Sequence, residues 1–259
     1  MRQIYVNVIL ATIAHTCESF SPVQRLSRRD SLLTTVGSVV SGSLLLPAPS
    51  SAVSKGGVQW NIDLPDEFAV QRQLASIVRV RIETVLQAEE ASGATAKLLL
   101  LPFGAQAGGS LNGDEQFAIA SYVYNGEGSV STVGKTMLSS ASRSPGVVSL
   151  KPQGAPSGYT AADGRRYVRY GYVTERCAGE LDGGDCYGTV STRRTMATLT
   201  MSSISQYRTN EERKRMAELG QVRNVDVLWL LTLSAPDGAP WQKLEKTFEK
   251  VSDSLSVPV

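Results

Sequence analysis

The segment Asn224–Val257 reads NVDVLWLLTLSAPDGAPWQKLEKTFEKVSDSLSV and contains two regular elements in succession. After Asp226 its first half is apolar at consecutive positions, which is typical of a strand buried on both faces in the middle of a sheet. Its second half carries an apolar stripe at steps of three and four residues, as on one side of a helix. This stripe consists of Trp241, Leu244, Phe248, Val251 and Leu255. Pro240 suits the first turn of such a helix, and we expect the stripe to cover a sheet face.

From Trp60 onward the sequence indicates alternating strands and helices with glycine-rich breaks. The alternation in residues 77–85 (IVRVRIETV) predicts a half-exposed strand, and the apolar run 96–103 (AKLLLLPF) predicts a better buried one. Residues 114–125 (DEQFAIASYVYN) fit a helix and a strand equally well. We expect a short helix near Val133–Ser140 and a surface loop at 151–158 (KPQGAPSG).

A β-hairpin is the plainest local signal. Residues 165–177 (RRYVRYGYVTERC) and 186–203 (CYGTVSTRRTMATLTMSS) are rich in Tyr, Val and Thr, and a glycine-containing tip joins them. Glycine permits the positive φ that a tight turn requires, so we expect antiparallel pairing. Downstream, Thr209 or Asn210 can cap a helix that Gly220 ends.

The segment Ser27–Ala52, SRRDSLLTTVGSVVSGSLLLPAPSSA, is typical of a cleavable targeting signal. A membrane-spanning helix needs roughly 20 predominantly apolar residues, and this run is shorter and diluted by Ser, Thr and Gly. It also lacks the helical stripe of a buried helix. Arg28–Arg29, a weakly apolar run, and the small residues Ser50 and Ala52 are typical of a twin-arginine signal. The alternative is a disordered N-terminal extension.

A second signal precedes it. Arg2, the apolar run Ile4–Ala14 and the small residue Ser19 indicate a secretory signal peptide, and a short basic piece resembling a transit peptide follows. The motif CESFSP (17–22) resembles the Phe-centred cleavage motif of plastid proteins in algae with complex plastids. Three targeting signals in series would direct the protein to the thylakoid lumen. We therefore divide the chain into a secretory signal (1–19), a transit piece (20–27), a twin-arginine signal (28–52) and one domain (53–259).

Removal of this presequence changes the charge balance. It contains four of the 26 Lys and Arg residues and two of the 24 Asp and Glu residues, so 22 of each sign remain. The near-neutral domain gives little reason to expect nucleic acid as a partner. His15, the one histidine, is also removed. This excludes serine-type triads, Cys-His dyads and histidine metal sites, and we find no carboxylate pair in a catalytic motif.

The tip of the hairpin offers two candidate features. Cys177 and Cys186 could form a disulfide in an oxidising compartment, with two free thiols as the alternative. Glu180, Asp182 and Asp185 could offer oxygen ligands to calcium, although their spacing is not that of an EF-hand. The alternative is a solvated tip.

The strands of the hairpin carry several arginines that could dock the protein to an acidic lumenal surface. The alternative is that they are exposed strand positions balanced by nearby acids. The candidate docking residues are Arg165, Arg166, Arg169, Arg193 and Arg194.

Residues 225–257 resemble the C-terminal signature of the PsbP family: an apolar strand, a polar turn, a Trp-led helix and a final Asp-Ser-hydrophobe-Ser-Val. Residues 60–68 (WNIDLPDEF) resemble the early aromatic and Leu/Ile-Pro segment of that family. The resemblance implies an α+β fold, in which an antiparallel sheet is flanked by helices as an α-β-α sandwich. It also implies residence in the plastid thylakoid lumen, peripheral to the membrane.

The role that the resemblance implies is non-catalytic association with photosystem II and its other extrinsic subunits. The chain would be an extrinsic subunit of the oxygen-evolving complex or an assembly factor. The best-known member of the family is thought to use its N-terminal segment and histidines, and this domain has no histidine and only a brief stretch before Trp60. The alternatives are a photosystem I assembly factor and a lumenal enzyme.

Overall fold

The computed structural model describes residues 52–57, 60–74, 82–103, 111–162, 164–182, 185–205, 209–221 and 224–257. The three predicted parts of the presequence, 1–19, 20–27 and 28–52, lie outside the described residues except for Ala52. Their boundaries therefore stay predictions.

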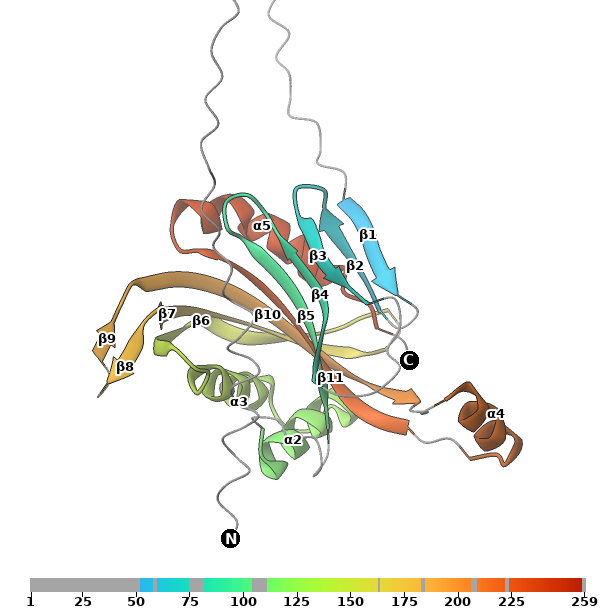
Figure 1. The fold of residues 1–259 in the computed structure, drawn as a ribbon. Helices are drawn as coiled ribbons and strands as arrows, with labels where there is room; N and C mark the ends of the chain where they lie inside the picture. The colour runs from blue at the N-terminus through green and yellow to red at the C-terminus, as the bar shows by residue number, and fades with distance from the viewer. Residues whose placement is uncertain are drawn as a thin grey trace, which may run out of the picture. The chain divides into compact units, whose positions relative to one another are not determined.

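A seven-stranded antiparallel sheet forms the centre of the fold (Figure 1). In spatial order the strands are β3 (Ala69–Gln73), β4 (Glu83–Glu89), β5 (Thr95–Pro102), β11 (Asn224–Pro236), β10 (Val190–Ser205), β7 (Arg166–Cys177) and β6 (Val147–Thr160). The central place of β11 confirms the prediction from its continuous apolar run, since both of its faces lie under other layers.

Two small ribbons accompany this sheet. One pairs β1 (Ala52–Gly57) with β2 (Trp60–Pro65), and the other pairs β8 (Glu180–Asp182) with β9 (Asp185–Tyr187). The second ribbon forms the tip of the predicted hairpin, whose long strands β7 and β10 pair from Val168 to Cys177.

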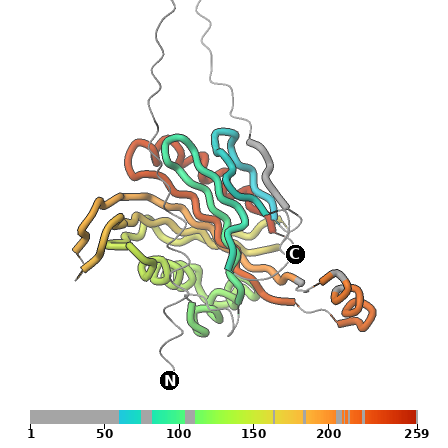
Figure 2. The backbone as a smooth tube through the Cα atoms, in the orientation of Figure 1, coloured from blue at the N-terminus to red at the C-terminus, as the bar shows by residue number. Residues whose placement is uncertain are grey.

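Helices lie on both faces of the large sheet, as Figure 1 shows. Helix α5 (Ala239–Asp253) covers one face, and α2 (Gly113–Ala120), the π-helix η1 (Ser121–Asn125) and α3 (Val130–Ser142) cover the other. The α+β class and the helix–sheet–helix layering expected from the sequence are therefore confirmed. Helix α4 (Asn210–Glu218) connects β10 to β11 beyond the ends of these strands (Figure 2).

Two buried clusters fill the spaces between the layers. The first joins β2, the sheet and α5, and includes Trp229, Phe248 and Leu64. The second lies under α2, η1 and α3, and includes Val168, Leu199 and Leu228. Neighbouring residues of a strand point to opposite faces of the sheet. Trp229 therefore belongs to the first cluster and Leu228 to the second.

The predicted helix stripe is buried against the sheet as expected, and Pro240 lies in the first turn of α5. Thr209 caps α4 by accepting a hydrogen bond from the backbone N–H of Glu212 at 3.0 Å. In α2, Asn112 and Glu115 form a reciprocal capping box. None of the described helices is long and apolar enough to cross a bilayer.

Residues 114–125, whose sequence fits a helix and a strand equally well, are helical throughout, as α2 and η1. Two local predictions need correction. The strand expected at 77–85 begins at Glu83, and residues 75–81 lie outside the described part of the chain. The predicted loop KPQGAPSG belongs to β6, which is an edge strand. Proline cannot donate to a strand ladder, but the outer side of an edge strand requires no donor.

Candidate functional site

The edge strand β6 opens a small slot in the sheet beside β7. The two strands pair from Ser149 to Gln153 and again from Ser157, whereas residues 154–156 face Tyr170 alone. Such a bulge leaves extra residues without a cross-strand partner and bends the strand. The slot at this point has a volume of about 160 Å³ and is also lined by residues of β10 and of the first turns of α5.

Arg194 on β10 is half-buried and lines this slot. Its guanidinium carbon lies 5.2 Å from the centroid of the Trp241 ring, in a cation–π contact. Its Nη2 donates a hydrogen bond to Oε1 of Gln153 at 3.0 Å. These two contacts fix the guanidinium plane between α5 and β6.

Glu245 also lines the slot, one helical turn after Trp241. Its Oε1 accepts a hydrogen bond from the indole Nε1 of Trp241 at 3.1 Å. Among the ion pairs of the described residues, none joins Glu245 to Arg194. The walls of one small slot therefore carry a cation and an anion that are not paired with each other.

Arg169 on β7 reaches the slot but is engaged by the end of α5. Its Nε donates to Oγ of Ser252 at 2.9 Å, and its Nη2 lies 2.5 Å from Oδ1 of Asp253. The guanidinium also lies over the ring of Tyr159, 5.4 Å from its centroid. Arg169 thus fastens the last turn of α5 to the sheet.

Arg165 and Arg166 serve other neighbours. Nη1 of Arg165 donates to the carbonyl oxygen of Met201. Nη1 of Arg166 donates to the carbonyl oxygen of Tyr124 at 3.1 Å. This carbonyl lies at the end of η1, where the last carbonyl groups of a helix have no donor within the helix. Gly126 follows with φ of 73°, and a Cβ there would meet the Arg166 guanidinium at 2.7 Å.

Arg193 bonds to the β4–β5 turn through the carbonyl oxygen of Gly93 at 2.8 Å and to Ser234 at 3.1 Å. All five predicted docking arginines are half-buried. The structure does not bring these five arginines together into one exposed patch, because each binds a different part of the fold. Of the five, only Arg169 and Arg194 line the same slot.

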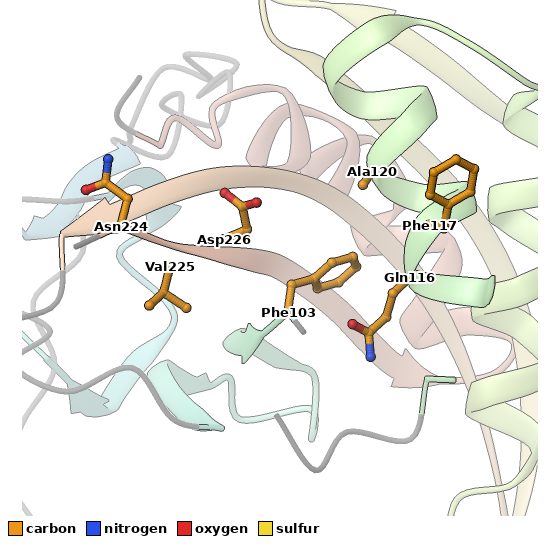
Figure 3. Close-up of a pocket in the computed structure, with 7 residues that line it drawn as sticks. All are labelled: Phe103, Gln116, Phe117, Ala120, Asn224, Val225 and Asp226. Atoms are coloured by element: carbon orange, nitrogen blue, oxygen red, sulfur yellow. The ribbon is translucent and has the colours of Figure 1, made fainter. Parts of the chain in front are cut away.

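A larger groove of about 520 Å³ lies at the start of β11 (Figure 3). Gln116, Phe117 and Ala120 of α2 line it from one side, and Phe103 and residues 224–226 line it from the other. The Phe117 side chain is 72% exposed. This groove is not predictable from the sequence, because it depends on α2 lying beside β11, which follows α2 by about 100 residues.

Tyr124 donates its hydroxyl hydrogen to Oδ1 of Asp226 at 3.2 Å, beside this groove. Two effects raise the pKa of Tyr124 above its usual value. The larger is the partial burial of the hydroxyl, and the second is the negative charge of Asp226. The hydroxyl therefore stays protonated and keeps donating across the neutral pH range.

The ribbon tip carries the predicted cysteine pair. Cys177 and Cys186 are joined as a disulfide with Cα atoms 5.6 Å apart. Beside it, Gly179 and Gly188 pack backbone to backbone, since a Cβ on Gly188 would lie 2.8 Å from the Cα of Gly179. Only glycine fits this close approach.

The three tip acids, Glu180, Asp182 and Asp185, are exposed on β8 and β9. No group of three or more His, Cys, Asp or Glu side chains within the described residues is arranged to hold a metal ion. Calcium binding by the three tip acids therefore stays a prediction.

The sequence does not predict the slot at the β6 bulge either. Its pattern places Trp241 in the helix stripe and Gln153 in a surface loop. A proline- and glycine-containing interruption within a strand is the one signal that could have indicated a bulge there.

The likeness of this chain to known proteins is found among solved structures. No family model matches the sequence, and no curated protein matches it either. Among solved structures, the chain is similar to the solution structure of cyanobacterial PsbP (CyanoP) from Synechocystis, with a TM-score of 0.45 and 11% sequence identity over 84% of this chain and 98% of that one.

Proposed function

We propose that this chain is a non-catalytic protein of the thylakoid lumen that associates peripherally with photosystem II. It would act as an extrinsic subunit of the oxygen-evolving complex or as a PsbP-like assembly factor. The proposal rests on the resemblance of residues 60–68 and 225–257 to the PsbP family. The observation that carries it is that these two segments, far apart in the sequence, form one packed unit.

Backbone hydrogen bonds join the two segments directly. The N–H of Asn61 donates to the carbonyl oxygen of Ser256 at 2.8 Å, and the N–H of Ser256 donates back to Asn61 at 2.9 Å. The N–H of Asp63 donates to Oγ of Ser254 at 2.8 Å. Strand β2 is therefore held to the end of α5 by polar contacts along its exposed side.

The apolar sides of the two segments also share one core. Trp60, Ile62 and Leu64 belong to the same buried cluster as Phe248 and Val251. The rings of Phe68 and Phe248 lie 6.3 Å apart, within the range of aromatic contacts. The two segments that resemble the PsbP family therefore form one packed unit.

The composition agrees with a docking role. Beyond His15 the sequence contains no histidine, so imidazole-based nucleophilic and acid–base catalysis has no carrier in residues 53–259. A protein that works by association needs a stable surface instead. This favours a photosystem-associated protein over a lumenal enzyme.

The test is native fractionation of thylakoids from the source organism, followed by mass-spectrometric identification of the proteins that co-migrate with this chain. We expect it to migrate with photosystem II and to be released by a rise in salt, since exposed charge contacts weaken as salt screens them. Migration with photosystem I alone would favour the assembly-factor alternative there. A chain found wholly in a free pool would contradict the docking role.

A further inference from the structure

The slot at the β6 bulge has the composition of a binding site for a small zwitterion. We propose that it binds a ligand that carries one carboxylate and one ammonium group, of the size of glycine or alanine. This inference is independent of the proposed association with photosystem II, because it rests only on the residues that line the slot.

The positive wall is Arg194. A guanidinium group has five N–H donors in a planar fork that matches the two oxygens of a carboxylate. One donor is used by Gln153, and stacking on Trp241 holds the plane without consuming any donor. Among the described residues, no carboxylate lies within ion-pair distance of Arg194, so the fork keeps donors for a ligand.

The negative wall is Glu245. Its Oε1 accepts the indole hydrogen of Trp241, which fixes the carboxylate on the helix, and its second oxygen keeps acceptor capacity. An ammonium group has three donors and would complement it. Because Arg194 and Glu245 are opposite in charge and are not paired with each other, a ligand that carries both signs would complement both groups.

Arg169 does not upset this balance. It also lines the slot, but its charge is offset by Asp253 at 2.5 Å, and its Nε is given to Ser252. Among the charged residues that line the slot, the two that no ion pair of the described residues offsets are therefore Arg194 and Glu245, one of each sign.

The volume of the slot limits the ligand. With a volume of about 160 Å³ the slot is small, so a ligand that enters it should be a compact molecule such as glycine. Ala155 and Ser157 of the bulge also line the slot and are exposed.

The experiment measures binding of glycine to the full chain in solution through the indole N–H resonance of Trp241. This resonance is assigned by its loss in Trp241→Phe, since the chain has three tryptophans. Acetate and methylammonium, which each carry one of the two groups, are titrated separately. We expect a saturable shift with glycine and at least tenfold weaker responses to the other two probes.

Two variants and a matched control test the assignment of the walls. Glu245→Gln keeps an acceptor for the Trp241 indole while removing the negative charge, and Arg194→Gln removes the positive charge. Each is expected to weaken glycine binding at least tenfold. Arg143→Gln makes the same change at a half-exposed ion pair with Glu115 and should leave glycine binding unchanged.

The outcomes separate clearly. Weakened binding in Glu245→Gln and Arg194→Gln, with Arg143→Gln unchanged, supports the proposal. If Arg194→Gln fails to fold, Glu245→Gln and the acetate titration still decide. An equal response to acetate and glycine, or no saturable shift with glycine, would overturn it.

Discussion

Phe248 and Phe117 carry the same side chain in opposite surroundings. Phe248 is fully buried, and its ring lies 5.4 Å from that of Trp241 and 6.3 Å from that of Phe68. Replacing a buried Phe by Ala removes its transfer free energy and leaves a cavity, so Phe248→Ala should lower the free energy of unfolding by about 3–5 kcal/mol. Phe117→Ala, at a 72% exposed side chain, should change it by about 0.5 kcal/mol or less. Urea unfolding measures both, and equal losses would contradict the burial of Phe248.

The contacts of the five arginines could not be predicted from the sequence. The alternation of residues along β7 and β10 indicates which face of the sheet each arginine lies on, but it does not identify the residue that each one binds. Arg169 bonds to residues that follow it by more than 80 positions, and Arg193 to a turn about 100 positions before it. A guanidinium group makes such contacts as readily as it stays in water, so charge alone could not distinguish a docking residue from a fastening one.

At the scale of elements, the contact between α3 and β6 depends on Gly134. A Cβ there would overlap the Pro156 ring on β6. Alanine is the better helix former by about 1 kcal/mol, yet Gly134→Ala should destabilise the protein by about 1–3 kcal/mol, because the added methyl overpacks a close contact. Thermal unfolding measures the change.

Gly113→Ala is the matched control in α2, since its added Cβ meets nothing within 4 Å. It should be neutral or stabilising, because alanine is the better helix former and no contact opposes it. A destabilisation as large as that of Gly134→Ala would show that packing against Pro156 is not the cause.

The ribbon of β8 and β9 gives a second prediction at this scale. Closing a short loop through Cys177 and Cys186 should contribute about 2–3 kcal/mol to stability by restricting the unfolded chain. The double replacement of both cysteines by serine should lower the midpoint of unfolding accordingly. Non-reducing peptide mapping of protein isolated from its native compartment should find the two cysteines linked, and two free thiols would refute the bridge.

Elements with a strong period were predictable, and those that depend on a neighbour were not. The patterns of β11 and α5 place them correctly because each carries its own burial signal. The segment 151–158 looks like a loop by composition and becomes a strand only because β7 offers it a pairing edge. For the same reason neither the bulge nor its slot could be predicted, since both arise from a mismatch between two strands.

At the scale of the whole molecule, the three predicted targeting signals before Val53 make a prediction about import. Replacing Arg28 and Arg29 together by lysine should stop import into the lumen and leave the precursor on the stromal side, because the twin-arginine route requires both arginines. Import into isolated thylakoids measures this, with the unmodified precursor as the control. N-terminal sequencing of the imported protein should begin at Val53 within a residue or two. Normal import of the lysine variant would contradict the twin-arginine assignment.

The central position of β11 has a consequence for the order of synthesis. The strands β3, β4 and β5 are joined to β10, β7 and β6 within the large sheet only through β11, the last strand of that sheet to leave the ribosome. Until residue 236 has emerged, two half-sheets exist with unsatisfied inner edges, and such edges are prone to pair with other chains. A nascent chain should therefore become protease-resistant in one late step rather than gradually, and it would need protection by chaperones for most of its translation.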